Sequence, residues 1–307
     1  MPISIGPAKC LLKLIVGARL PTGSVPVAAN ASKASLLPAG AAAVRDQLMT
    51  ERGTSSTLVS WRLLWRLPLL TIHVLIGVPL VLFTFLPGLR NLPLGTRRLH
   101  EHGHLTWSGL MLRIFGIRLD IRGRLPDGPG LIVANHISWM DIVMLHALWP
   151  MWLVAKAEIR GWPLIGVLAE LAGTLFIQRG SEASRQRVNR RMAALLRRGY
   201  RVGIFPEGGI RPERGVGRFH ARLFAPALRV GVPVIPIAIR YDRGGDLHDI
   251  MVFGPGQNFF TNLLRLLAHP PCTGRLTVSE PLTAGAGGRS ELARRAQAVV
   301  SAAYEQQ

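Results

Sequence analysis

The sequence predicts an α/β fold, in which a mixed, mostly parallel sheet is flanked by helices and preceded by an N-terminal membrane-associated hydrophobic helix. Short apolar runs alternate with helical patterns from about residue 118 onward, as expected when strands and helices alternate along a chain. A run of 20 residues near position 70 carries no formal charge. Because 49% of the 307 residues are apolar, disorder is excluded over most of the length.

The net charge of the chain favours anionic partners. There are 37 Lys and Arg against 17 Asp and Glu, which gives a formal charge of +20 at pH 7. Such a balance suits nucleic acid, anionic lipid, or acidic and phosphorylated substrates. With three tyrosines and no recognisable nucleic-acid-binding motif, we expect no nucleic-acid partner. Two cysteines, Cys10 and Cys272, exclude a disulfide framework and a cysteine zinc site.

Residues 1–48 differ in composition from the rest of the chain. They are rich in Ala, Ser, Gly and Pro, and their first acidic residue is Asp46. A signal peptide fits poorly, because Lys13 and Arg19 interrupt or flank the only apolar run, whereas a transit-like peptide would fit the composition. We predict a disordered extension, or a non-native one with translation starting at Met49.

Residues 67–86 form the predicted hydrophobic helix, within a membrane-associated helical region over residues 49–117. At about 1.5 Å of rise per residue, this run spans roughly 30 Å, the thickness of a hydrocarbon core. Trp61 and Trp65 lie where interfacial aromatic residues are expected. Arginines on both flanks give no orientation, and two internal prolines would kink a straight span. We expect a membrane-anchored or in-plane helix; a buried core helix is the alternative.

Residues 118–307 form the predicted α/β domain. Strands are expected at Arg118–Ile121, Gly130–Ala134, Met151–Ala155, Thr174–Ile177, Val202–Phe205, Val232–Ile239, Met251–Phe253 and Leu276–Val278. Helices are expected over about 98–116, 184–199 and 290–304. Pro233 and Pro236 argue against a regular central-strand ladder at those two points, and an edge strand is one alternative there.

His136 and Asp141 are the candidate catalytic pair. They follow the apolar run that begins at Leu131, at a strand-to-helix turn, where side chains converge at the carboxyl edge of a sheet. Positions five apart on one regular helix point about 140° apart. His136 must therefore lie on the turn, with Asp141 one turn into the helix, for the two to meet. Asp141 would then fix the imidazole tautomer, and His136 could deprotonate a hydroxyl. The alternative is a packed histidine beside a helix-capping carboxylate.

Arg179 ends the apolar strand of the run that begins at Gly173, at the same predicted edge. Its planar guanidinium could bind a phosphate through two parallel hydrogen bonds, in a bidentate contact. A solvated strand-end charge is the alternative. Seven more arginines lie between residues 185 and 201, against the single acidic residue Glu182, whereas an ordinary solvated helix mixes charges of both signs.

A third block, Phe205–Gly209, interrupts a strand at Pro206 and places Glu207 before paired glycines. Such glycines let the backbone approach a ligand and present N–H groups to phosphate. A plain turn would account for the glycines, but not for an acidic residue at a strand end in so basic a chain.

Three alternating histidines, His100, His102 and His104, have a spacing that would place three metal ligands on one face of a strand. Their surroundings have helical periodicity instead, which aligns only the first and the third. We predict no metal site.

These blocks together resemble the glycerolipid acyltransferase family, the bacterial 1-acylglycerol-3-phosphate acyltransferases and their relatives. The matching motifs are N-H-x4-D at Asn135–Asp141, G-x-x-F-I-x-R at Gly173–Arg179, F-P-E-G at Phe205–Gly208 and V-P-V-I-P at Val232–Pro236. Lys156 lies in a segment similar to the family's stretch between the first two motifs. The resemblance covers about residues 118–282, and four motifs in order make it specific.

The resemblance implies transfer of a fatty acyl group from acyl-CoA or acyl-carrier protein to the free hydroxyl of lysophosphatidate, making phosphatidate in phospholipid biosynthesis. It implies that His136 is the general base, that Asp141 orients it, and that no acyl-enzyme forms. No cofactor beyond the acyl donor is implied. The acyltransferase domain would be residues 118–307, at the cytoplasmic face of the inner membrane, whose anionic surface attracts Lys and Arg. The implied substrate-binding residues are Asn135, Lys156, Gly173, Phe176, Arg179, Phe205, Pro206, Glu207, Gly208, Gly209 and Arg211.

The chain departs from the family pattern after the third motif. The family commonly reads F-P-E-G-T-R, but Gly209 and Ile210 occupy the last two positions here, and Arg211 comes one place late. Arg211 could compensate, or the acceptor could be another lysolipid, such as lyso-ornithine lipid. A non-catalytic basic protein that binds membrane or nucleic acid is the remote alternative.

Overall fold

The computed structural model describes residues 40–86, 88–95, 97–162 and 165–306, with side chains from Trp61 onward except that of Leu171. The chain divides into two compact units, residues 1–51 and 52–307, and the sheet with its helices belongs to the second. The extension predicted over residues 1–48 falls mostly outside the described residues. Residues 40–48 form the start of helix α1 (Gly40–Thr84).

A seven-stranded mixed sheet forms the centre of the fold. Its strands are β3 (Ile117–Arg122), β4 (Leu131–Ala134), β5 (Trp152–Lys156), β6 (Leu175–Ile177), β7 (Val202–Ile204), β8 (Val234–Asp242) and β9 (Cys272–Val278). They lie in the order β3-β9-β8-β4-β7-β5-β6. The five strands from β8 to β6 are parallel, whereas β9 runs antiparallel to β8 and parallel to β3. The predicted fold class is confirmed.

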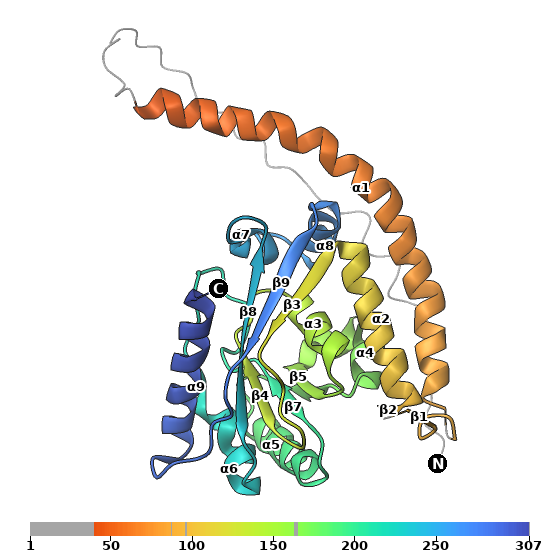
Figure 1. Cartoon of the computed structure of the whole chain (residues 1–307), viewed down its shortest axis with the longest axis vertical. Helices are drawn as coiled ribbons and strands as arrows, with labels where there is room; N and C mark the ends of the chain where they lie inside the picture. The colour runs from red at the N-terminus through yellow and green to blue at the C-terminus, as the bar shows by residue number, and fades with distance from the viewer. Residues whose placement is uncertain (1–39, 87, 96, 163–164, 307) are drawn as a thin grey trace, which may run out of the picture. The chain divides into compact units, whose positions relative to one another are not determined.

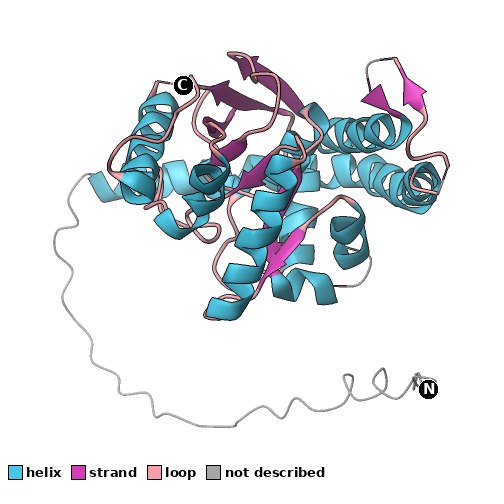
Figure 2. Ribbon diagram, turned by 90° about the horizontal axis from the view of Figure 1, so that it is seen from below, coloured by secondary structure: helices cyan, strands magenta, loops and turns pink. Residues whose placement is uncertain are grey.

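Helices cover both faces of the sheet (Figures 1 and 2). They are α2 (Leu99–Phe115), α3 (Met140–Leu148), α4 (Ile165–Leu171), α5 (Glu182–Arg197), α6 (Ala225–Val230), α7 (His248–Met251), α8 (Phe259–Ala268) and α9 (Gly288–Glu305), with the 3-10 turns η1 (Ala157–Gly161) and η2 (Ala221–Phe224). Helix α2 packs on α3, β3 and α8, whereas α5 packs on α6, β6 and β7, and α9 packs on β8, η2 and α6. A small hairpin of β1 (Pro93–Leu94) and β2 (Arg97–Arg98) joins α1 to α2.

Helix α5 shows how the sequence pattern produces this packing. The Ser181 side chain caps its N-terminus by accepting from the Ser184 N–H at 3.1 Å. Val188, Met192, Leu195 and Leu196 are buried on its inner face, as helical spacing requires. Gly199 follows the helix with a φ of +85°, a conformation that glycine adopts without strain.

One strand prediction and one alternative need correction. Residues 251–253 form no strand, because α7 ends at Met251 and a loop follows. Strand β8 is central rather than an edge, although it contains Pro236. The Pro236 carbonyl accepts from Ser279 N–H at 3.0 Å, just beyond the last register pair with β9, Ile237 and Val278. The proline's missing N–H therefore falls where the ladder has ended.

The predicted hydrophobic run lies in α1, which continues through both prolines and ends at Thr84. Its segment Trp61–Thr84 is long and apolar enough to cross a membrane. Arg66 is buried, and its guanidinium donates to the carbonyls of Leu267 and His269 at 2.9 and 2.7 Å. Many apolar side chains of the same segment are exposed: Trp61, Leu64, Leu69, Ile72, Leu75, Ile76, Leu80 and Phe83. The segment Trp61–Thr84 is therefore attached to the rest of the fold along one side and exposes many apolar side chains elsewhere.

Candidate active site

Strand β4 carries the first motif to the carboxyl edge of the sheet. Its four residues are fully buried between β7 and β8. The Asn135 side chain follows directly, donating to the Ile239 carbonyl at 2.9 Å and accepting from the Ile239 N–H at 2.7 Å. Both ends of its amide are thus used to join β4 to β8. Asn135 is buried behind the site and positions the turn, rather than facing a substrate.

Asp141 is fully buried in the first turn of α3 and receives four hydrogen bonds. Its Oδ2 accepts from His136 Nδ1 at 2.9 Å and from the N–H groups of Ile137 and Ser138 at 2.7 and 2.9 Å. Its Oδ1 accepts from the Tyr241 hydroxyl at 2.6 Å. His136 lies on the turn and Asp141 one turn into the helix, the arrangement that the spacing required.

The carboxylate determines which imidazole nitrogen is basic. Because Asp141 accepts at Nδ1, that nitrogen carries the proton and Nε2 of His136 remains free to take one. The Phe205 ring stacks on the imidazole with centroids 4.0 Å apart and planes 15° apart, which fixes the ring orientation. Burial and the charge of Asp141 hold the pKa of Tyr241 well above its usual value, so its hydroxyl stays a donor.

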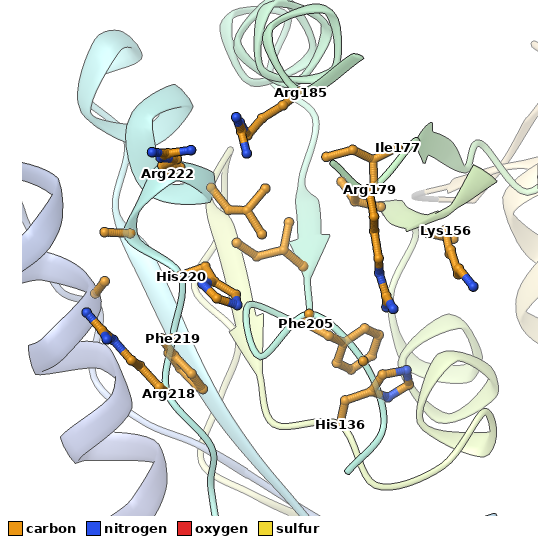
Figure 3. A pocket seen from close by; sticks show the side chains of 18 of the residues that line it. His136, Lys156, Ile177, Arg179, Arg185, Phe205, Arg218, Phe219, His220 and Arg222 are labelled. Carbon is orange, nitrogen blue, oxygen red and sulfur yellow. The ribbon is translucent and has the colours of Figure 1, made fainter. Parts of the chain in front are cut away.

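A cavity of about 1030 Å³ opens beside His136 (Figure 3). Its cationic lining side chains are Lys156, Arg179, Arg185, Arg218, Arg222 and Arg294, and no Asp or Glu is among the described residues that line it. Gly180 and Ser181, at the start of α5, also face the cavity, so the positive end of a helix adds to this potential. The site is suited to bind an anion next to a base.

The cavity brings together six of the predicted site residues: His136, Lys156, Arg179, Phe205, Gly208 and Gly209. A Cβ at Gly209 would lie 3.0 Å from a terminal nitrogen of Arg179. The departure from the family's threonine therefore leaves room for the Arg179 guanidinium.

Other predicted residues lie outside the cavity. Ile177 lines it, so Phe176, its neighbour in β6, faces the opposite side of the strand, where the Arg160 guanidinium lies 5.9 Å from the ring centroid. A Cβ at Gly173 would lie 2.9 Å from the Trp152 ring, so this glycine serves packing. Pro206 is buried.

Glu207 and Arg211 hold the loop after β7. Glu207 Oε1 accepts from the Gly217 N–H at 3.2 Å, and Arg211 Nε pairs with Glu213 Oε2 at 3.2 Å. Burial raises the pKa of Glu207 to about 7, against the lowering effect of the N–H groups of Gly217 and His136. Neither residue lines the cavity. In this structure both side chains make contacts within the loop after β7.

Sequence reasoning missed five residues that complete the site. Tyr241 anchors Asp141 from β8, and Arg218, His220, Arg222 and Arg294 line the cavity. The run of arginines between residues 185 and 201 gave no signal for them, because none of the five lies in it. Arg294 comes from α9, and the fold alone brings that helix beside η2.

The three histidines of α2 form no metal site. His102 Nε2 lies 2.9 Å from the Leu94 carbonyl, and His100 Nδ1 contacts the Arg90 carbonyl. His104 packs against His146 of α3, and burial lowers the pKa of His104 to about 4. Among the described residues, no group of three His, Cys, Asp or Glu could hold a metal ion.

Comparison with known proteins places this geometry in a family. Residues 117–240 match the family described as Acyltransferase. The lyso-ornithine lipid O-acyltransferase of Pseudomonas aeruginosa is 42% identical over 194 residues, which cover 63% of this chain and 75% of that protein. The chain belongs to the acyltransferase family. The matched residues of this acyltransferase include His136, Asp141 and Arg179, whereas Arg294 of α9 lies beyond them.

Two further relatives extend the comparison. The 1-acyl-sn-glycerol-3-phosphate acyltransferase of Neisseria meningitidis serogroup B is 37% identical to this acyltransferase over 133 residues, 43% of this chain and 52% of that protein. The crystal structure of the 1-acyl-sn-glycerophosphate acyltransferase of Thermotoga maritima superposes with a TM-score of 0.62 at 21% identity, covering 80% of this chain and 94% of that one. That structure supports the fold.

Proposed function

We propose that this acyltransferase moves a fatty acyl group from acyl-CoA or acyl-carrier protein to the free hydroxyl of lysophosphatidate. The observation that carries the proposal is the His136–Asp141 pair at a cavity whose charged lining side chains are all cationic among the described residues. A phosphomonoester acceptor matches that lining, because Arg and Lys bind phosphate oxygens strongly. No cofactor beyond the donor enters the proposal.

The reaction needs one base and no enzyme nucleophile. Nε2 of His136 takes the proton of the acceptor hydroxyl as the oxygen attacks the thioester carbonyl. The tetrahedral intermediate collapses, the C–S bond breaks, and the thiolate takes the proton back from the imidazolium. Asp141 stabilises that imidazolium.

The oxyanion of that intermediate needs donors. The N–H groups of Ile137 and Ser138 already donate to Asp141, which removes the turn after β4 from the candidates. In the turn after β7, the Gly208 N–H donates to the Phe205 carbonyl at 3.3 Å, so Gly209, which also lines the cavity, is the candidate that remains. We assign the oxyanion to that turn.

Lyso-ornithine lipid is a second candidate acceptor. The Pseudomonas relative is named for it, and Gly209 replaces the family's threonine at the phosphate-binding motif. Its carboxylate could occupy Arg179, but its ammonium group would find no acidic partner among the described residues that line the cavity. The cavity therefore favours lysophosphatidate, and the sequence similarity favours the other lipid.

The apolar surface of α1 supports a membrane location for the reaction. One side of the helix contacts the rest of the fold at two points. Arg66 donates to the Leu267 carbonyl, and the His73 ring stacks on Trp107 of α2 with centroids 5.1 Å apart. A helix held in this way is expected to lie in the membrane interface beside the domain, with its exposed side chains in lipid. We place the enzyme at the cytoplasmic face, where anionic lipids attract a basic chain.

The test is an assay of membrane fractions with labelled acyl-CoA and acyl-carrier protein, offering lysophosphatidate and lyso-ornithine lipid separately. His136→Ala should abolish transfer in a protein that still folds, with a modest loss of thermal stability, because Asp141 Oδ2 loses one donor but keeps the N–H groups of Ile137 and Ser138. His102→Ala, an equivalent change outside the site, should keep full activity. Transfer that survives in the His136 variant would overturn the general-base assignment. Transfer only to lyso-ornithine lipid would change the assigned acceptor and leave the proposed mechanism unchanged.

A further inference from the structure

A second concave site adjoins the cavity, with a volume of about 450 Å³. It is lined by Glu182, Arg185, Gln186, Asn189, Arg190, Arg222, Ala225, Arg229 and Arg289. We call it the arginine groove. Five of its lining residues are arginines, one is acidic, and none is aromatic.

The arginine groove is built by the regular geometry of α5. Five of its residues, at positions 182, 185, 186, 189 and 190, follow the spacing of one helix face. The other wall comes from η2, α6 and the start of α9, through Arg222, Arg229 and Arg289. Cations thus converge from four elements, which a solvated helix face by itself would not produce.

Internal ion pairs neutralise only part of this charge. Glu182 contacts Arg185 and lies 3.8 Å from Arg222, so one carboxylate serves two guanidinium groups. Arg190, Arg229 and Arg289 have no ion pair among the described residues. Their forks remain available for an anionic ligand.

The arginine groove and the cavity beside His136 share two lining side chains. Arg185 and Arg222 line both. In Figure 3 these two side chains lie at the opposite end of the view from His136 and Phe205. A single ligand could therefore extend from the general base, past Arg185 and Arg222, into the groove.

We propose that the arginine groove binds the phosphate-bearing end of a coenzyme A thioester, its diphosphate bridge and its phosphomonoester. The inference rests on the proposed function, because the thioester must reach His136. A concave site of this volume suits part of a small molecule, and arginine forks suit phosphate oxygens. Because none of the described residues that line the groove is aromatic, we expect its phosphates, rather than stacking of its base, to supply the affinity.

The two donors differ in what they offer this site. Coenzyme A carries its phosphates on a compact nucleotide, whereas a carrier protein presents one phosphodiester and an acidic protein surface. The groove is hollowed rather than flat, which favours the nucleotide. Acyl-carrier protein would then bind independently of Arg190 and Arg229.

The experiment measures binding of free coenzyme A and of dephospho-coenzyme A to the full chain in detergent, by calorimetry, without any need for turnover. The test variant is Arg190→Gln combined with Arg229→Gln. The control is Arg187→Gln combined with Arg191→Gln, which removes the same charge from exposed positions of α5 outside both sites. Loss of two charge-assisted contacts should weaken coenzyme A binding by about tenfold or more in the test variant only. The difference in affinity between coenzyme A and dephospho-coenzyme A should also become smaller in the test variant.

Steady-state kinetics distinguish the two acyl donors. They also distinguish a failure of this inference from a failure of the proposed function. The KM for acyl-CoA should rise in the test variant with kcat unchanged, whereas the KM for acyl-pantetheine, which lacks phosphate, should stay the same. Unchanged coenzyme A binding, or an equal loss in the control, would overturn the proposal. A KM that rises only for acyl-carrier protein would also overturn it, and would make the groove a protein-docking surface. His136-dependent turnover of acyl-pantetheine would keep the proposed function in each case.

Discussion

Asp141 depends on hydrogen-bond donors from distant parts of the chain. Its own turn supplies Ile137 and Ser138, the motif supplies His136, and β8 supplies Tyr241, 100 residues away. A fully buried carboxylate needs such partners, because an unpaired buried charge is strongly destabilising. The orientation of the His136 imidazole thus depends on Asp141, which is itself buried away from the cavity.

Replacing Tyr241 with Phe should lower both stability and turnover. The change removes one donor and leaves Asp141 Oδ1 unsatisfied in a buried site, a loss of about 1–3 kcal/mol of unfolding free energy. With the carboxylate less well held, kcat should fall several-fold while KM for the acceptor stays unchanged. Denaturant unfolding and steady-state kinetics measure the two effects. A normal kcat in a destabilised variant would limit Tyr241 to a structural role.

Glu207 should make the stability of the protein depend on pH. Burial raises its pKa from 4.5 to about 7 in the folded state, so folding favours the protonated carboxyl. The associated stability is fully present below about pH 4.5 and is lost as the pH rises through about 7, by up to about 3 kcal/mol. Glu207→Gln should therefore flatten the unfolding free energy between about pH 5 and pH 8. An unchanged slope in that variant would assign the dependence to other groups.

At the scale of elements, α1 and α2 are held together by close contact of small and aromatic residues. A Cβ at Gly77 would lie 2.8 Å from Trp107 Cδ1, and the His73 ring stacks on the same tryptophan. At Gly103 of α2, a Cβ would lie 3.2 Å from the Thr84 side chain. Both glycines allow the two helices to approach each other closely. The exposed apolar side chains lie on α1 of this helix pair.

Two helix-interior glycines form a matched pair of variants. Gly109→Ala meets open space and should raise the unfolding free energy by about 0.5–1 kcal/mol, because alanine loses less conformational freedom in a helix. Gly77→Ala has the same favourable effect on conformational freedom, but its methyl group overlaps Trp107. The unfolding free energy should therefore fall by about 1 kcal/mol or more. Thermal unfolding compares them. Equal effects from the two changes would mean that α1 and α2 do not pack as described.

The whole molecule combines a charge of +20 with a helix whose apolar side chains are exposed. Two forces therefore act toward an anionic membrane. Electrostatic attraction is screened by salt, and burial of apolar surface in lipid is not. The charged side chains that line the cavity are also cationic among the described residues, so we expect an anionic substrate to be attracted as an anionic membrane would be.

Binding to anionic vesicles should weaken with salt without disappearing. Raising the ionic strength removes the contribution of the arginines, whereas the exposed side chains of Trp61–Thr84 stay buried in lipid. Co-sedimentation with vesicles across a salt series measures this, with neutral vesicles as the control. Complete release at high salt would show that α1 does not insert.

The local patterns of the sequence determined the fold class, most strands and helices, and the turns that carry the site. Hydrophobic periodicity reports which side of an element is buried, and parallel strands bring their carboxyl ends to one edge. The spacing of His136 and Asp141 alone defined how the two must meet. Local signals failed at residues 251–253, where an apolar run proved to be a helix end and a loop.

Tertiary structure decided which distant side chains meet. It turned Asn135 and Phe176 away from the cavity, used Glu207 to brace a loop, and joined Tyr241 to Asp141. It also selected a few arginines, from α5, η2, α6 and α9, to face the cavity and the arginine groove. The physical reason is that long-range contacts depend on how whole elements pack, and no pattern within a single element records that packing.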